Sequence, residues 1–124
     1  MKRISTGSAF EKKMGYSRAI VKSGWCFISG VTGYDYATME IPDSAALQTR
    51  NCFATIAKVL TEAGFEMDDI VRVQYTVTNT GFVDEIIPEL GAALSEIRPA
   101  ATMVIAGLIR PEMKIEIEVT AFKG

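Results

Sequence analysis

The stretch SAALQTRNCFATIAKVLTEAG, residues 44–64, decides the fold of this 124-residue chain. Its apolar residues recur every three or four positions, which is the spacing of one face of an α-helix. Asp43 or Ser44 can cap the free amides at its start, and Gly64 is a residue type that commonly ends a helix. We therefore predict an amphipathic helix that packs its apolar face on a sheet.

The flanking segments predict the strands of that sheet. Residues 69–78 alternate strictly between apolar and polar types, which is typical of a strand with one buried face. Val71, Val73, Tyr75 and Val77 share the apolar side of this segment. Further strands are predicted over residues 18–22 and 25–29, joined by a tight turn as a hairpin, and over residues 100–108 and 113–122.

A second helix is predicted over residues 82–96, where Pro88 either kinks the helix or marks its first turn. The predicted order is ββαβαββ, an α+β fold with one mixed sheet and two helices on one face, and residues 1–124 form a single domain. The other sheet face is too polar for a dry core, because it carries Gln74, Thr76, Glu116 and Glu118. Such a face is either solvated or lines a subunit interface that contains binding sites.

Composition restricts the chemistry. The chain has no histidine, which excludes Ser–His and Cys–His nucleophiles and every metal site built on imidazole. Carboxylate, tyrosine, lysine and cysteine side chains remain for proton transfer. Residues 1–24 carry a net charge of +5 and the remainder carries −7. This distribution suits a small anionic ligand or a subunit contact better than nucleic acid.

The two cysteines indicate a reducing compartment. Cys26 and Cys52 lack CxxC spacing, and one pair is too few for a disulfide framework, so we expect reduced thiols in a cytoplasmic protein. No apolar run approaches the roughly 20 residues that span a bilayer. Residues 1–14 are basic and polar, which is not the pattern of a secretory signal. We expect no membrane contact.

A series of short motifs in a fixed order carries a family resemblance. The motifs are Gly15-Tyr16-Ser17-Arg18-Ala19, Ile28-Ser29-Gly30, Gln48, the helix end at 59–65, Arg98-Pro99-Ala100 and Ile115-Glu116-Ile117-Glu118. In this order and spacing they resemble the Rid family of YjgF-like proteins, also called L-PSP endoribonucleases, over nearly the whole chain. The resemblance implies a fold like that of the small bacterial chorismate mutase, assembled as a trimeric barrel with sites between subunits. It also implies cofactor-free hydrolysis of reactive enamines and imines to 2-oxo acids and ammonia.

The resemblance also implies site residues. Glu116 matches the glutamate that positions or activates water, Tyr16 matches the site tyrosine, and Ser29-Gly30 matches the pair whose backbone approaches the ligand. The family arginine that grips the substrate carboxylate is replaced by Ala101, and a position that is often cysteine is Met103. The sequence therefore resembles a divergent subgroup whose substrate differs from simple 2-imino acids.

Several alternatives stay open at this point. Arg18 and Arg98 can each replace the missing arginine as an anion anchor, or can form ordinary salt bridges; residues 16 and 18 of one strand project to the same face. Glu116 beside Glu118 is either a carboxyl with a raised pKa or one of two solvated charges. The leading function is a deaminase-like hydrolase. A non-catalytic ligand-binding or chaperone-like trimer is the alternative, and a ribonuclease has the least support.

Overall fold

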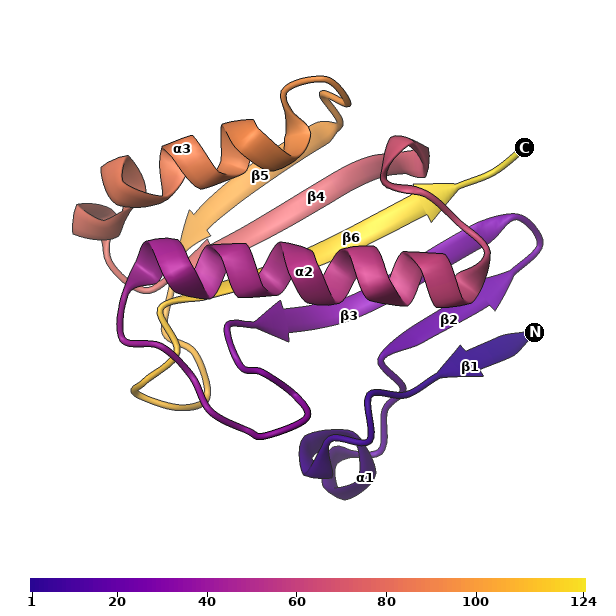
Figure 1. Cartoon of the computed structure of the whole chain (residues 1–124), viewed down its shortest axis with the longest axis horizontal. Coiled ribbons are helices and arrows are strands. Elements are labelled where there is room, and N and C mark those ends of the chain that lie inside the picture. The colour runs from indigo at the N-terminus through magenta and orange to yellow at the C-terminus, as the bar shows by residue number, and fades with distance from the viewer.

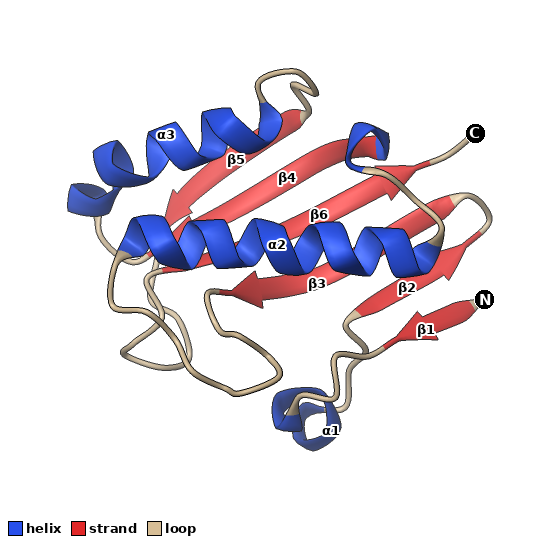
Figure 2. Ribbon diagram, in the orientation of Figure 1, coloured by secondary structure: helices blue, strands red, loops and turns tan.

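The computed structural model describes residues 1–124 as one sheet covered on one side by two helices (Figures 1 and 2). Six strands pair in the order β1-β2-β3-β6-β4-β5. Only β4 and β5 are parallel, so the sheet is mixed, as predicted. The strands are β1 Lys2–Ile4, β2 Ala19–Lys22, β3 Trp25–Thr32, β4 Ile70–Val77, β5 Ala100–Ile105 and β6 Ile115–Phe122.

The two long helices lie across the same face of the sheet (Figure 1). Helix α2 spans Ala45–Ala63, where the Ser44 Oγ accepts a hydrogen bond from the Leu47 amide and Gly64 ends the helix with φ 83°. The predicted helix and both of its ends are therefore confirmed. Helix α3 spans Val83–Leu94 and continues through Pro88, so this proline does not mark the first turn. Two 3-10 turns, Met67–Asp69 and Thr80–Phe82, precede β4 and α3.

The structure adds two elements at the N-terminus that the sequence did not predict. Strand β1 pairs with β2, and helix α1, Ala9–Met14, lies beyond the end of the sheet away from α2 and α3 (Figure 2). Ser8 caps α1 through a hydrogen bond from the Phe10 amide, and Gly15 ends it with φ 74°. A strand of three residues and a helix of six are too short to give a clear periodic pattern.

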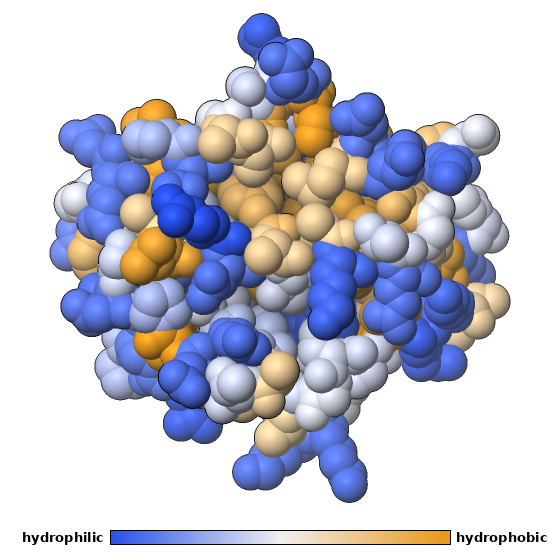
Figure 3. Space-filling model, viewed as in Figure 1, coloured by the Kyte–Doolittle hydropathy of each residue, from blue (hydrophilic) through white to orange (hydrophobic).

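The core fills the space between the sheet and the two long helices, where 22 buried residues form one cluster. As predicted, the core is faced by Val73, Tyr75 and Val77. The prediction that Val71 shares this buried face is wrong, because Val71 is 43% exposed. The cause is a shift in the pairing of β4 with β6 between Ile70 and Arg72. On the outer surface of this side, apolar side chains gather in the upper middle of the view among hydrophilic ones (Figure 3). None of the helices is long and apolar enough to cross a bilayer.

Strand β3 is longer than predicted and contains an irregularity. The predicted strand ended at Ser29, whereas pairing with β6 continues to Thr32. The register shifts between Ile28 and Val31, which places Ser29 and Gly30 in a β-bulge. Bulges bend a strand and redirect its side chains, and they are frequent beside functional sites.

Candidate active site

Glu116 is the centre of the candidate site. Its neighbours Ile115 and Ile117 are fully buried in the core, so the Glu116 side chain projects from the opposite face of β6. It pairs across the sheet with Thr32 on β3 and Thr76 on β4. Glu116 is half-buried.

The environment of Glu116 favours its protonated form. Burial raises the pKa of this carboxyl above its ordinary value, the negative charge of Glu118 raises it further, and the positive charge of Arg18 acts in the opposite direction. A carboxyl whose pKa is raised toward the working pH can both accept and return a proton. Of the open alternatives for Glu116, the structure therefore favours the perturbed carboxyl.

The Gly30 backbone lies directly against the Glu116 carboxylate. A Cβ atom at position 30 would lie 2.5 Å from Cδ of Glu116 and 2.8 Å from each carboxylate oxygen. Real Cβ atoms essentially never approach another atom so closely. The bulge at Ser29-Gly30 thus brings a bare stretch of main chain to the carboxylate.

We expect Gly30→Ala to displace the Glu116 carboxylate while the fold persists, because the obstructing atoms belong to a flexible side chain. Overpacking of this kind costs on the order of 1–3 kcal/mol. Thermal unfolding followed by circular dichroism measures the cost. In a Glu116→Ala background the same substitution at Gly30 should cost almost nothing, and an equal loss of stability in both backgrounds would contradict the contact.

Arg18 lies at the end of the sheet, and its guanidinium is fully enclosed by protein. Its side chain is 1% exposed. The Nη1 atom donates to the carbonyl oxygen of Gly30 at 2.7 Å, and Nη2 lies 3.5 Å from the Tyr16 hydroxyl. The guanidinium carbon lies 4.8 Å from the centre of the Tyr36 ring and 5.6 Å from that of Tyr16. A carboxylate on the opposite side, Glu11, completes the enclosure with its Oε2 3.8 Å from Nε.

This enclosure changes the interpretation of Arg18. An anion anchor must present free donors to a ligand, and here the donors face the protein's own groups. An anion-binding role for Arg18 therefore stays a prediction, while its observed contacts are structural. Ser29 is similar, since its hydroxyl donates to the Ser17 carbonyl at 2.7 Å and its amide donates to the Arg18 carbonyl at 2.9 Å.

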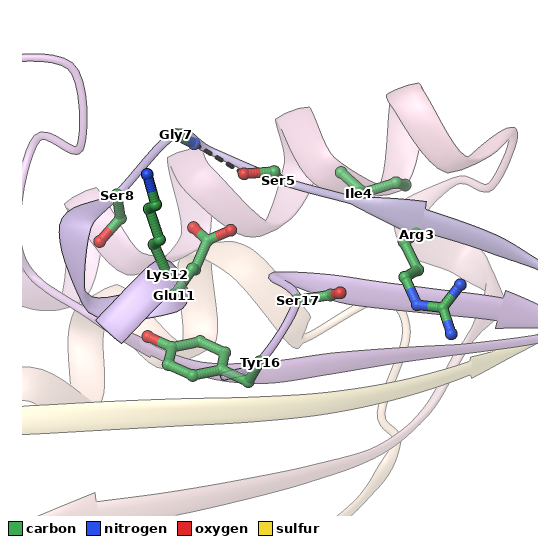
Figure 4. A pocket seen from close by; sticks show the side chains of 9 residues that line it. All are labelled: Arg3, Ile4, Ser5, Gly7, Ser8, Glu11, Lys12, Tyr16 and Ser17. Atoms are coloured by element: carbon green, nitrogen blue, oxygen red, sulfur yellow. Dashed lines mark hydrogen bonds between the residues drawn. The ribbon is translucent and has the colours of Figure 1, made fainter. Parts of the chain in front are cut away.

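Two cavities are lined by residues that contact Arg18, although Arg18 itself lines neither. The first has a volume of about 320 Å³ and lies in the N-terminal segment, where Tyr16 and Glu11 form part of its wall (Figure 4). Burial raises the pKa of the Tyr16 hydroxyl above its ordinary value, although the nearby Arg18 charge opposes this. The second, of about 530 Å³, lies between α2 and the loop after β3 and is lined by Tyr34, Tyr36, Asn51 and Lys58, among others. Glu116 lines neither cavity.

The remaining predicted residues lie apart, within one chain, from the cluster formed by Glu116, Gly30, Arg18 and the side chains around Arg18. Ala101 and Met103 on β5 pair with Val73 and Tyr75 on β4, whose side chains face the core, so they share the helix-covered side of the sheet. Met103 packs against the core. They could therefore meet a Glu116 side chain only through another copy of the chain.

Arg98 also lies apart from Glu116. It is exposed and has φ 53°, and its amide donates to the Leu94 carbonyl at 2.8 Å, so its backbone closes the C-terminal end of α3. The role of Arg98 as an anion anchor stays a prediction.

Cysteines and acidic groups add no further reactive cluster. Cys26 and Cys52 are both free and buried, and burial raises the pKa of each thiol, which keeps both in the unreactive protonated form. The Cys52 thiol donates to the Val31 carbonyl. No group of three or more cysteine, aspartate or glutamate side chains converges closely enough to hold a metal ion.

Two residues of the cluster were missed by sequence reasoning. Glu11 is only 5% exposed although it lies in a strongly basic segment, where a single acid gave no signal beyond its charge. Tyr36 lies in the loop after β3, where no sequence pattern singled it out, and its hydroxyl accepts a hydrogen bond from the Thr32 amide at 3.0 Å. Both contacts depend on tertiary structure.

The architecture is that of a small α+β domain with a carboxylate on its uncovered sheet face. Residues 6–123 match the family model described as Endoribonuclease L-PSP. The chain belongs to this family, which confirms the resemblance noted in the sequence.

Individual relatives agree over the full length. A RutC family protein of Leuconostoc mesenteroides subsp. cremoris is 32% identical, with 98% of each chain covered. The crystal structure of Rv2704 from Mycobacterium tuberculosis, described as a member of the YjgF/YER057c/UK114 family, is 33% identical with a TM-score of 0.90, and 98% of each chain is covered. RidA from an Antarctic Psychrobacter is 27% identical with a TM-score of 0.82, covering 87% of this chain and 88% of that one.

Proposed function

We propose that this protein hydrolyses a reactive imine or enamine without a cofactor, with Glu116 as the catalytic carboxylate. The observation that carries the proposal is the half-buried Glu116 with its raised pKa, held against the bare Gly30 backbone on a sheet face that the helices leave uncovered. Membership of the family supports a small-molecule deaminase or an endoribonuclease-like role in general.

The proposed reaction needs one water molecule and no electron carrier. The oxygen of water bonds to the carbon of the C=N group while Glu116 accepts a proton from that water. Glu116 returns that proton to the nitrogen of the carbinolamine that forms from the protonated imine. The C–N bond then breaks and ammonia leaves, while the carbinolamine hydroxyl gives its proton to Glu116 as the C=O bond forms. An enamine enters the same route after protonation on carbon. The Tyr16 side chain and the backbone of Ser29-Gly30 hold the substrate beside the carboxylate.

In the proposed assembly, three copies form the barrel and each site lies between two of them. The edge strand β5 supports this arrangement, because Val104 and Ile105 on it are 39% and 46% exposed and its outer edge is unpaired. An exposed apolar edge strand is a template for pairing with another chain. A neighbouring copy then brings its own exposed Ala101 and Arg98 to the cleft. Analytical ultracentrifugation tests this assembly. A protein that sediments as a monomer would have no such clefts, and this part of the proposal would be wrong.

A second candidate function is a trimer that binds a small ligand without turnover. Ala101 favours it, because a methyl group cannot make the paired charge-assisted hydrogen bonds that an arginine makes to a carboxylate. The loss of such contacts costs on the order of 1.5–3 kcal/mol in binding. An anionic 2-imino acid is therefore expected to be a poor substrate.

The test supplies freshly generated 2-aminoacrylate in one arm and an uncharged imine in the other, and follows ammonia release. Hydrolysis is expected to exceed the buffer rate, and to favour the uncharged imine. No acceleration in either arm would leave only the ligand-binding function. RNA cleavage that is unchanged in Glu116→Gln but is lost on further purification would indicate a contaminating nuclease.

A further inference from the structure

We propose that Glu11 and Arg18 form a buried positioning pair that fixes the bulge of β3 and, through it, the Glu116 carboxylate. The catalytic meaning of this pair rests on the function proposed above, but its effect on Glu116 is measurable without any substrate. Neither residue contacts the reacting atoms in this assignment.

Glu11, the first member of the pair, connects the N-terminal segment to Arg18. Glu11 lies on α1 and is 5% exposed, and its Oε2 accepts hydrogen bonds from the amide and the hydroxyl of Thr6. Burial alone raises the pKa of this carboxyl, but the hydrogen bonds from Thr6 and Ser5 and the Arg18 charge outweigh burial and lower it. Glu11 is therefore ionised at neutral pH. Figure 4 shows its carboxylate between Ser5 and Tyr16, in the wall of the smaller cavity.

The energetic cost of burying the Glu11–Arg18 ion pair indicates that the pair has a role beyond stability. Oε1 of Glu11 and Nε of Arg18 are both buried without a hydrogen-bond partner. A buried ion pair with unsatisfied atoms is a weak source of stability, and well-packed apolar side chains often replace such pairs without loss. Stability alone therefore does not account for a charged pair at this position.

Arg18, the second member of the pair, is connected to β3 at residues 30 and 32. Arg18 donates directly to the Gly30 carbonyl, and its guanidinium lies against the Tyr36 ring, whose hydroxyl binds the Thr32 amide. Thr32 is the β3 residue that pairs with Glu116, and Gly30 is the residue whose backbone abuts the carboxylate. Gly30 and Thr32, the two residues of β3 that these contacts hold in place, are therefore both neighbours of Glu116.

The charge of Arg18 acts on the same group. Among the titratable groups near Glu116, Glu118 on the same strand opposes ionisation and Arg18 favours it. Cys52 on α2 is close enough for the Glu116 charge to raise the pKa of its thiol, but that thiol stays neutral. Arg18 is therefore the cation that offsets the burial of Glu116.

The test is an NMR titration of the Glu116 side-chain carboxyl carbon in the ligand-free protein. Arg18→Gln removes a positive charge and should move the Glu116 midpoint to higher pH. Glu11→Gln removes a negative charge and leaves Arg18 unpaired, so it should move the midpoint to lower pH. Arg3→Gln, which removes an exposed positive charge from the same segment, is the matched control and should leave the midpoint unchanged.

These opposite directions separate an electrostatic action of the pair on Glu116 from mere structural support. A purely structural pair predicts that both substitutions loosen the bulge and move the midpoint the same way. Equal shifts in Arg18→Gln and Glu11→Gln, or no shift in Arg18→Gln, would therefore overturn the proposal. If Arg18→Gln does not fold, the Glu11→Gln/Arg18→Gln double variant is compared with Glu11→Gln, and the guanidinium is again expected to lower the midpoint.

The titration is independent of activity, so failure of the deaminase proposal leaves its result intact. Where turnover is found, Arg18→Gln should lower kcat about tenfold or more and leave KM nearly unchanged. An anion anchor would instead raise KM for a charged substrate alone. That second pattern would also overturn the positioning role.

Discussion

Replacing Glu116 by glutamine is expected to lower kcat for imine hydrolysis by about 10²–10⁴-fold, which is the usual contribution of a positioned general base. The amide keeps the size of the side chain but cannot accept a proton from water. Binding contacts stay in place, so KM should change little. Steady-state kinetics of ammonia release at several pH values measures both constants, and an unchanged kcat would contradict the assignment of Glu116.

The pH profile of this reaction follows from the raised pKa of Glu116. The base must be ionised to accept a proton, so the rate should fall as pH drops through that raised pKa, and Glu116→Gln should lose this dependence. Glu118→Gln is the matched control on the same strand face. It removes the like charge that raises the pKa of Glu116, so it should retain activity and move the fall in rate to lower pH.

Although Glu116→Gln should lower activity, it should not lower the thermal stability of the fold at neutral pH. A carboxyl whose pKa is higher in the folded state than in the unfolded state stabilises the fold only while protonated, and this stability is lost as pH rises through the folded pKa. Glutamine stays neutral at every pH and avoids that loss. The variant should therefore unfold at the same or a higher temperature than the native protein at neutral pH, which shows that lost activity is not lost structure.

The parts of the fold that the sequence predicted are those with long periodic patterns. Helix α2 was predicted to begin at Asp43 or Ser44 and to end at Gly64, and the structure selects Ser44. Capping chemistry marked both ends in addition to the periodicity. Strand β6 was also recovered, since Ile115, Ile117 and Val119 alternate with charged residues. The bulge at Gly30 was not recovered, because a glycine after an apolar run equally suggests a loop.

The candidate site was predicted only where a motif named its residues. Glu116, Gly30 and Tyr16 came from the family resemblance, and the structure brings the first two into direct contact. The burial of Arg18 could not be predicted, because its partner Glu11 lies on a helix too short to leave a periodic signal. A charged side chain is expected at the surface unless a partner is known.

A second glycine of the same segment, Gly33, should show a different and larger effect on stability. A Cβ atom at position 33 would lie 2.6 Å from the Cα of Gln48, which is backbone of α2 and cannot rotate away. Gln48 itself is fully buried, and its side chain binds the carbonyls of Pro42 and Glu112 and the amide of Lys114. Any shift of α2 therefore disturbs the two loops that this side chain joins.

We expect Gly33→Ala to destabilise the protein by about 3 kcal/mol or more, at the upper end of overpacking costs, which lowers the melting temperature by roughly 10 °C in a domain of this size. Differential scanning calorimetry measures both quantities. The control is Gly91→Ala on α3, where an added Cβ meets nothing within 4 Å and alanine should stabilise the helix by up to about 1 kcal/mol. A melting temperature of Gly33→Ala equal to that of the native protein would contradict the close packing of β3 on α2. Because Gly30 abuts a side chain and Gly33 abuts a helix backbone, the first glycine keeps space for the site and the second keeps the helix on the sheet.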